Sequence, residues 1–160
     1  MADITKEDMY EGNYIKPCTP ELALSVGQNL RWEDRREVEQ QWPGFCAESI
    51  VVNAYYNSAY EQCVYFEVPN GKAAGVAGVT PQNVIWMLCT EASTEYPHTF
   101  VREARRWVES LPNTYLMNQA DMRNEAHIKL LKLLGFKFIR YHVYNGVPLI
   151  EFIKTCANQP

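Results

Sequence analysis

The sequence has no apolar run close to the roughly 20 residues that a helix needs to span a bilayer. Its first segment, MADITKEDMYEGNY, lacks both the apolar core and the basic flank of a signal peptide. We therefore expect residues 1–12 to form a polar leader. We also expect a protein that is made and kept in the cytoplasm, with no membrane-spanning segment.

Basic residues are also fewer than acidic ones. The chain has 15 Lys and Arg residues against 19 Asp and Glu residues, a formal net charge of -4. Proteins that bind nucleic acid usually gather basic residues to neutralise phosphates. We therefore expect no nucleic-acid partner.

Cysteine pairs and metal-binding spacings are missing. The five cysteines are an odd number and form no C-x-x-C pair, which predicts free, mostly buried thiols: Cys18, Cys46, Cys63, Cys89 and Cys156. No two of the histidines His98, His127 and His142 have the short spacing of a zinc site, so no metal is expected. Cys89 and His98 would need a third orienting residue to make a nucleophile, and none is evident.

What is present suits one folded domain over residues 1–160, because 47% of the residues are hydrophobic. Hydrophobic periodicity and turn residues predict a mixed α/β order, β-α-α-α-β-β-β-α-β-α-β-β, with helices on both faces of the sheet. The expected segments are a strand at 14–16, helices at 20–30, 31–42 and 47–58, strands at 62–68, 73–79 and 84–90, a helix at 98–111, a strand at 114–117, a helix at 124–134, and strands at 136–144 and 148–153.

Local signals support several of these boundaries. Thr19 before Pro20 is a helix start. Asn70-Gly71 and Asn145-Gly146 are expected to turn hairpins, and Gly135 to end the last helix with a positive φ.

The patterns also predict which side chains are buried. In the strand at 84–90, Trp86 and Leu88 are expected to be fully buried in the centre of the sheet. The helix at 31–42 should lie on the surface, with an apolar line of Trp32, Val38 and Trp42. The other helices are expected to bury Ile50, Ala54 and Asn57; Val101, Ala104, Val108 and Leu111; and Ile128, Leu131 and Leu134, leaving Arg102, Glu103, Arg106 and Glu109 in solvent.

The element order, with the segment NEAHIKLLKLLGFKF at 124–138, resembles the GNAT acetyltransferases. Asn124, Gly135 and Phe136 match the family's pattern for its last helix and the following strand. That resemblance implies a GNAT fold. It also implies a site for acetyl-CoA at a glycine-rich loop after the fourth strand, where small residues let backbone N–H groups and the helix dipole hold the pyrophosphate.

The matching segment here, Thr90 to His98, has no glycine, contains Pro97, and carries Glu91 and Glu95 beside the expected phosphates. The family's usual general acid is a tyrosine, and the aligned residue is Leu131, which cannot donate a proton. We therefore expect no cofactor and no catalytic residue. If acetyl-CoA were bound, the resemblance places Thr90, His98, Thr99, Arg102 and Asn124 around it, and Glu67 or Glu91 as general base.

A narrower resemblance is to the GNAT-like short internal virion proteins of short-tailed, T-seven-like bacteriophages, in which Asp34, Glu37, Trp86 and Thr90 correspond to recurring positions. It implies a non-catalytic protein made in the host cytoplasm and packaged in the virion, which contacts other virion proteins, or itself, in core assembly or genome ejection. The alternatives are an active N-acetyltransferase acting on an amine, and a host-takeover binding protein. The tyrosines Tyr55, Tyr56, Tyr60 and Tyr65 fit either an interface or the core.

Overall fold

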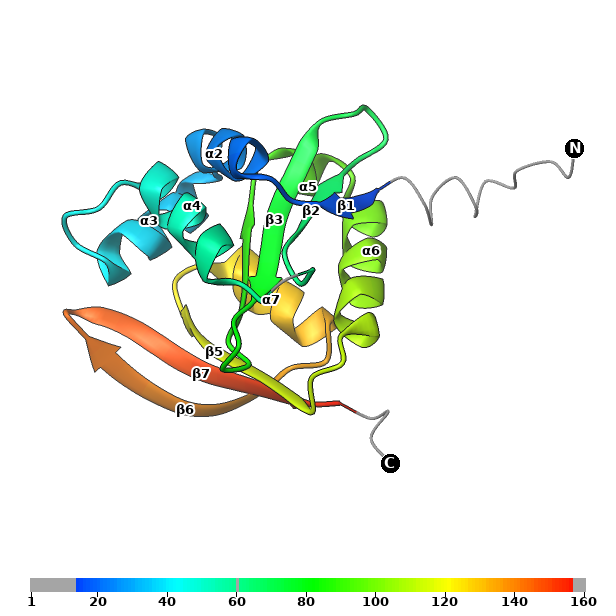
Figure 1. Cartoon of the computed structure of the whole chain (residues 1–160). Coiled ribbons are helices and arrows are strands. Elements are labelled where there is room, and N and C mark those ends of the chain that lie inside the picture. Colours follow the sequence, from blue (N-terminus) through cyan, green and yellow to red (C-terminus); the bar gives the residue numbers. More distant parts are fainter. Residues whose placement is uncertain (1–13, 60, 157–160) are drawn as a thin grey trace, which may run out of the picture.

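The computed structural model describes residues 14–59 and 61–156, so the predicted leader and Tyr60 lie outside the described residues. The chain order matches the prediction apart from one added short helix, α5 (Figure 1). The elements are β1 (Ile15–Pro17), α2 (Pro20–Gln28), α3 (Trp32–Gln41), α4 (Ala47–Asn57), β2 (Val64–Glu67), β3 (Ala73–Val79), β4 (Ile85–Cys89), α5 (Ala92–Glu95), α6 (Pro97–Ser110), β5 (Tyr115–Asp121), α7 (Glu125–Leu133), β6 (Lys137–Tyr144) and β7 (Val147–Thr155).

The strands form two antiparallel sheets, which part between β4 and β5. One sheet has the order β1-β2-β3-β4 and the other β5-β7-β6. In residues 14–59 and 61–156, one isolated parallel bridge joins them, Val84 with Met117, where Met117 N–H donates to the carbonyl of Asn83 over 3.0 Å. β4 is therefore the last strand of its ladder, and the expectation that it is central was wrong, because the sheet splits beside it.

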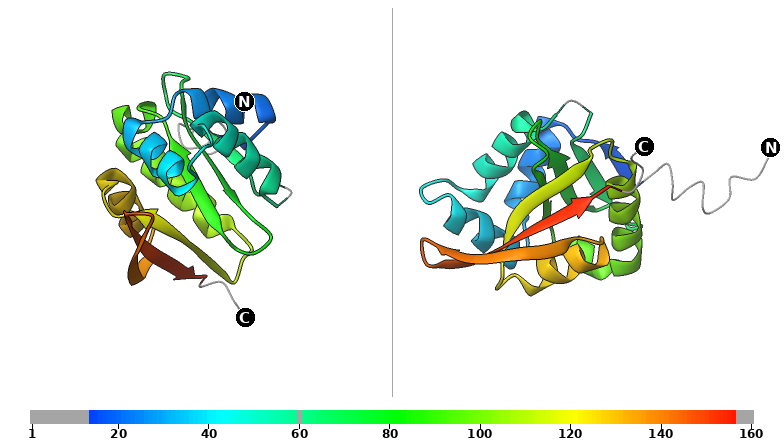
Figure 2. Two further views of the ribbon diagram at one scale, coloured as in Figure 1. Left: turned by 90° about the vertical axis from the view of Figure 1, so that its left-hand side faces the viewer. Right: turned by 90° about the horizontal axis from the view of Figure 1, so that it is seen from below.

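Helices cover both faces of the four-stranded sheet, as expected (Figure 2). Successive strand residues point to opposite faces, so Tyr65 and Phe66 of β2 enter different cores. The core that contains Phe66 is filled by α6 and α7, and the core that contains Tyr65 is filled by α2 and α4. Leu88 is buried as predicted, but Trp86 is partly exposed because it faces the opening beside β4.

The predicted turns and helix boundaries are confirmed. Gly71 has a φ of +83° between β2 and β3, while Asn145 and Gly146 have φ angles of +49° and +77° between β6 and β7. Gly135 follows α7 with a φ of +90°. Thr19 caps α2 by accepting a hydrogen bond from Leu22 N–H over 3.2 Å.

The burial predictions for the charged helices were right for Val38 and for the apolar side of α6, and wrong for several other residues. On α3 the buried residues are Asp34, Glu37 and Val38, while Trp32 and Trp42 are 64% and 51% exposed. The reason is that the charged face of α3 packs over polar partners from β4 and α7.

On α6, Ala104, Val108 and the following Leu111 are buried as expected. Glu103, however, is completely buried, because Arg102 and Arg106 both donate to its carboxylate over 3.2 Å. On α4 the helix buries Ala47 and Val51 and leaves Asn57 exposed.

The cysteines are free, but Cys46 is exposed and Cys63 and Cys156 are half-buried, so most of them are not buried. Of the described tyrosines named above, Tyr65 is in the core and Tyr56 is 66% exposed. The described helices all lack the length and hydrophobicity that a bilayer-spanning helix needs.

Candidate functional site

The parting of the two sheets opens a cleft that is roofed by α3 and α4 and reaches the face of α7. Its outer part is a cavity of about 700 Å³, lined by Gln41, Trp42, Phe45, Ser49, Ile50, Asn53, Ala54, Asn57, Thr80, Val84, Trp86, Asn118 and Gln119. Its inner part is smaller, about 100 Å³, and shares several of these residues. Among the residues that the structure describes, the ionisable side chains of the cleft's lining are Glu37 and His127, both in the inner part, which also reaches Met87 and Leu131.

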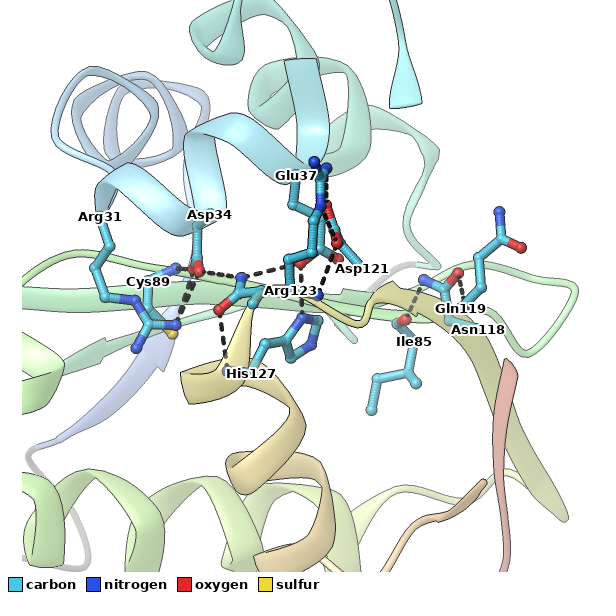
Figure 3. A network of polar contacts seen from close by, with 11 residues as sticks. Arg31, Asp34, Glu37, Ile85, Cys89, Asn118, Gln119, Asp121, Arg123 and His127 are labelled. Atoms are coloured by element: carbon cyan, nitrogen blue, oxygen red, sulfur yellow. Dashed lines mark hydrogen bonds and ion pairs between the residues drawn. The ribbon is translucent and has the colours of Figure 1, made fainter. Parts of the chain in front are cut away.

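At the base of the cleft, a buried polar network joins α3 to β4 and α7 (Figure 3). Asp34 accepts hydrogen bonds from the Arg31 guanidinium at 2.9 Å and 3.1 Å, from the backbone N–H of Cys89 at 2.7 Å and from the side-chain amide of Asn124 at 2.9 Å. The carboxylate is 3% exposed and the guanidinium 7%. The negative charge is thus balanced by one arginine and fully bonded, as a buried carboxylate requires.

Asn124 is the hub of this network. It is completely buried, and its amide nitrogen donates to both Asp34 and Glu37 at 2.9 Å. Its oxygen accepts the backbone N–H of His127 at 3.2 Å, which caps the start of α7. One asparagine therefore fixes the helix that carries His127 against the helix that carries Glu37.

His127 and Glu37 form an ion pair that faces the cleft. The imidazole Nδ1 lies 3.2 Å from Glu37 Oε1, and both side chains are almost buried. Burial by itself lowers the pKa of His127, but the charge and hydrogen bond of Glu37 outweigh it, so this pKa lies above its ordinary value. The pair can therefore hold a proton at the base of the cleft.

A second ionic contact lies beside this network. The guanidinium of Arg123, in the loop before α7, donates two hydrogen bonds to the buried Asp121, at 2.9 Å and 2.6 Å, and another to Gln40 on α3. Burial raises the pKa of Asp121, but the bonds from Arg123 bring it below its ordinary value. Asp121 is thus ionised and holds Arg123, whose bond to Gln40 ties the end of β5 to α3.

The segment after β4 is folded onto itself. Ala92 N–H donates to the Thr90 hydroxyl at 3.2 Å, Ser93 N–H to the Thr90 carbonyl at 3.1 Å, and Thr94 N–H to the Glu91 carbonyl at 2.9 Å. The Thr90 hydroxyl itself donates to the Ala73 carbonyl at 2.6 Å. The backbone donors at the start of this segment are therefore already paired.

The residues that the family resemblance placed at acetyl-CoA divide into buried and accessible ones. Thr90 and Asn124 are buried and bonded within the protein, whereas His98 and Thr99 lie on the first turn of α6 and are not buried. Arg102, one turn further, is ion-paired with Glu103.

Neither of the two candidate bases lines the cleft. Glu67, on β2, binds Lys16 at 2.8 Å and Tyr65, and Glu91 is exposed after β4. Among the described residues the carboxylate that lines the cleft is Glu37.

Sequence reasoning missed the pair of Glu37 and His127. One signal was available, because His127 lies four residues before Leu131 and therefore on the same face of α7.

Burial raises the pKa of Cys89 to about 12, so its thiol stays protonated and is a poor nucleophile. Among the described residues no three His, Cys, Asp or Glu side chains are grouped to hold a metal ion.

Comparison with known proteins gives a fold. No family model matches the chain, and neither does any curated protein sequence. A GNAT family acetyltransferase from Bacillus cereus is 11% identical and has a TM-score of 0.61, covering 90% of this chain and 97% of that one. An N-acetyltransferase from Staphylococcus aureus is 16% identical, with a TM-score of 0.57 and coverage of 88% and 99%.

A Salmonella typhimurium protein solved with its cofactor acetyl-CoA is 11% identical, with a TM-score of 0.54 and coverage of 91% and 94%. Such low identities speak for architecture alone. The predicted mixed α/β fold is thereby confirmed, and the chain has the fold of the GNAT acetyltransferase superfamily.

Proposed function

We propose that this chain uses the GNAT fold to bind a partner protein through its cleft, without transferring acetyl groups. The observation that carries the proposal is the internal bonding of the segment from Thr90 to Thr94. A phosphate needs backbone N–H groups that point outward at a helix start, and three successive donors here already have acceptors inside the segment.

Two further properties of this segment oppose a pyrophosphate. Glu91 and Glu95 place carboxylates beside it, and each like-charge contact with a phosphate costs on the order of 1 kcal/mol near a protein surface. Pro97 removes one donor from the first turn of α6. The residues present therefore do not fit the pyrophosphate of acetyl-CoA, and we derive no catalytic step from it.

The edge of β4 that faces the second sheet is also occupied by the protein itself. Asp34 takes the N–H of Cys89 at 2.7 Å, and the side-chain amide of Asn118 donates to the carbonyl of Ile85 at 2.7 Å. A ligand that lay along this edge would have to displace both contacts. This supports a cleft that binds through its outer cavity.

Acetyl transfer to an amine is the second candidate function, and the solved structures named above favour it. One observation in the cleft also favours it. The protonated His127, held by Glu37 within reach of the cavity, has the proton that Leu131 cannot supply. Bound acetyl-CoA would supply the acetyl group.

The narrower assignment to a phage virion stays a prediction from the sequence resemblance. Asp34 and Glu37, two of its recurring positions, lie in the buried network that joins α3 to α7. That placement supports a structural role for these two residues. A binding protein would need this role as much as an enzyme would. Mass spectrometry of purified particles tests whether this chain is among their proteins.

Calorimetry with acetyl-CoA at low salt tests the proposal, because weak screening gives any attraction to Arg102, Arg105 and Arg106 its full strength. We expect no measurable heat. Since a ligand at a hundred times its Kd adds about 2.7 kcal/mol of stability, a thermal-shift assay gives an independent reading. A Kd below about 50 micromolar together with acetylation of an amine would establish the second candidate instead.

A further inference from the structure

The outer cavity of the cleft has a lining without charge. Its thirteen residues, given above and here called the amide pocket, include no Asp, Glu, Lys, Arg or His, although 21% of the chain is charged. The ionisable side chains that the described part of the chain contributes to the cleft are Glu37 and His127 of the inner part, and they pair with each other. A charged ligand would lose its hydration here without meeting an opposite charge.

Carboxamides supply the polar groups of this pocket. Gln41, Asn53, Asn57 and Gln119 are among its lining residues, and their side chains make no hydrogen bond to the part of the chain that the structure describes. Asn118 is already bonded, since it donates to the Ile85 carbonyl and accepts the Gln119 N–H. Each of the four remaining carboxamides offers a donor and an acceptor, the same pair that a peptide unit presents.

Aromatic rings supply the apolar part. Trp42 and Phe45 stand at the rim, 51% and 62% exposed. Trp86 forms part of the wall, where its indole N–H donates to the Ser58 hydroxyl at 3.0 Å. Large aromatics that stay exposed beside a cavity are typical of binding sites, because burying them against a ligand ring gains area at little entropic cost.

From this chemistry we infer that the amide pocket binds an uncharged aromatic side chain of a partner polypeptide, with the partner's peptide groups bonded to the free carboxamides. A cavity of about 700 Å³ has room for one aromatic residue with its two flanking peptide groups. This inference rests on the proposed function, since it names the chemistry of the partner. It differs from that function in its test, which uses no acetyl-CoA.

Three tyrosine derivatives that differ only in charge test the pocket by saturation-transfer NMR at about pH 6, where an α-amino group is protonated. N-acetyltyrosinamide is neutral and models a tyrosine within a chain, N-acetyltyrosine is an anion, and tyrosinamide is a cation. We expect the neutral compound to bind at least about fivefold more tightly than either ion. Equal binding of the three, or binding of none, would overturn the inference.

Two variants place the binding in the pocket. Trp42→Ala should weaken binding of N-acetyltyrosinamide by about fivefold, as expected for one lost aromatic contact. Trp32→Ala is the matched control, because Trp32 is an exposed tryptophan of α3 outside the pocket, and it should change the affinity less than about twofold. Equal losses in both would refute the location.

A third variant tests the role of charge. Asn53 is exposed on α4, so Asn53→Asp changes the charge of the pocket at nearly constant size. It should raise the affinity for the cationic tyrosinamide and leave the anion excluded. An unchanged order of affinities in this variant would contradict the inference. If instead acetyl-CoA binds and reacts while the neutral compound also binds, the proposed function fails and the pocket remains.

Discussion

The carboxylate of Asp34 on α3 accepts the backbone N–H of Cys89 at the end of β4, across 55 positions of sequence. The same carboxylate binds Arg31 and Asn124. A helix whose sequence is mostly charged is thereby attached to the sheet through polar groups, and the burial of its charges depends on their partners.

Replacing Asp34 with Ala should therefore destabilise the protein severely. The change leaves the Arg31 guanidinium and the Cys89 N–H buried without this acceptor. Breaking a buried ion pair in this way lowers the free energy of unfolding by about 3–5 kcal/mol. Urea unfolding followed by circular dichroism measures the loss. The control is Arg140→Gln, which removes the exposed pair with Glu151 and should change stability little. A loss from Asp34→Ala no larger than the control's would contradict the role given to the network.

Stability should depend on pH through His127. Its pKa in the folded protein is above the ordinary value near 6.5, because Glu37 favours the protonated ring despite burial. The contribution of the ion pair with Glu37 to the free energy of unfolding is therefore complete below about pH 6, and it is lost as the pH rises through the raised pKa. Urea unfolding of the wild type and of His127→Gln between about pH 5.5 and 9 measures it. The advantage of the wild type should shrink toward high pH, and an advantage that stays constant or grows would refute the ion pair.

Leu88 offers a test of the second core. It is 8% exposed and packs with Val26, Val51 and Val76 under α2 and α4. Leu88→Ala should cost about 2–5 kcal/mol in unfolding free energy, the usual range for a large-to-small change in a core. A loss below about 0.5 kcal/mol would mean that this face of β4 is not packed.

Gly135 tests the end of α7. Its φ of +90° disfavours any side chain that branches at Cβ, and an added Cβ would lie 2.9 Å from the Lys154 ammonium. Gly135→Val should lower stability by about 1–2 kcal/mol, and Gly135→Asn by less, because asparagine tolerates the left-handed region better. Thermal unfolding of both variants checks this order. Equal effects would argue against a left-handed residue at this position.

The order of helices and strands was predictable because hydrophobic spacing and turn residues are local signals. The turns at Gly135 and at Asn145-Gly146 can be predicted from two or three adjacent residues, and the structure has them there. The buried strand at Leu88 was equally visible from its apolar run.

The polar contacts were not predictable, because their partners lie far apart in the chain. Asn124 meets Asp34 and Glu37 across 90 and 87 positions, and no local pattern relates them. The sequence predicted that Glu103 and the charged residues of α3 are exposed, because a hydrophobic pattern assigns every carboxylate to the solvent. The cleft with Glu37 and His127 followed from such contacts and so escaped sequence reasoning.

The parting of the sheets has a mechanical consequence. At one end of the gap, the Met117 N–H and the Asn118 amide hold β5 to β4, and at the other end Asp34 grips both Cys89 and Asn124. The two sheets are thus held together at both ends of the gap, and they cannot move apart without breaking these hydrogen bonds. A ligand in the outer cavity therefore lies in a gap of fixed width, beside the exposed rings of Trp42 and Phe45.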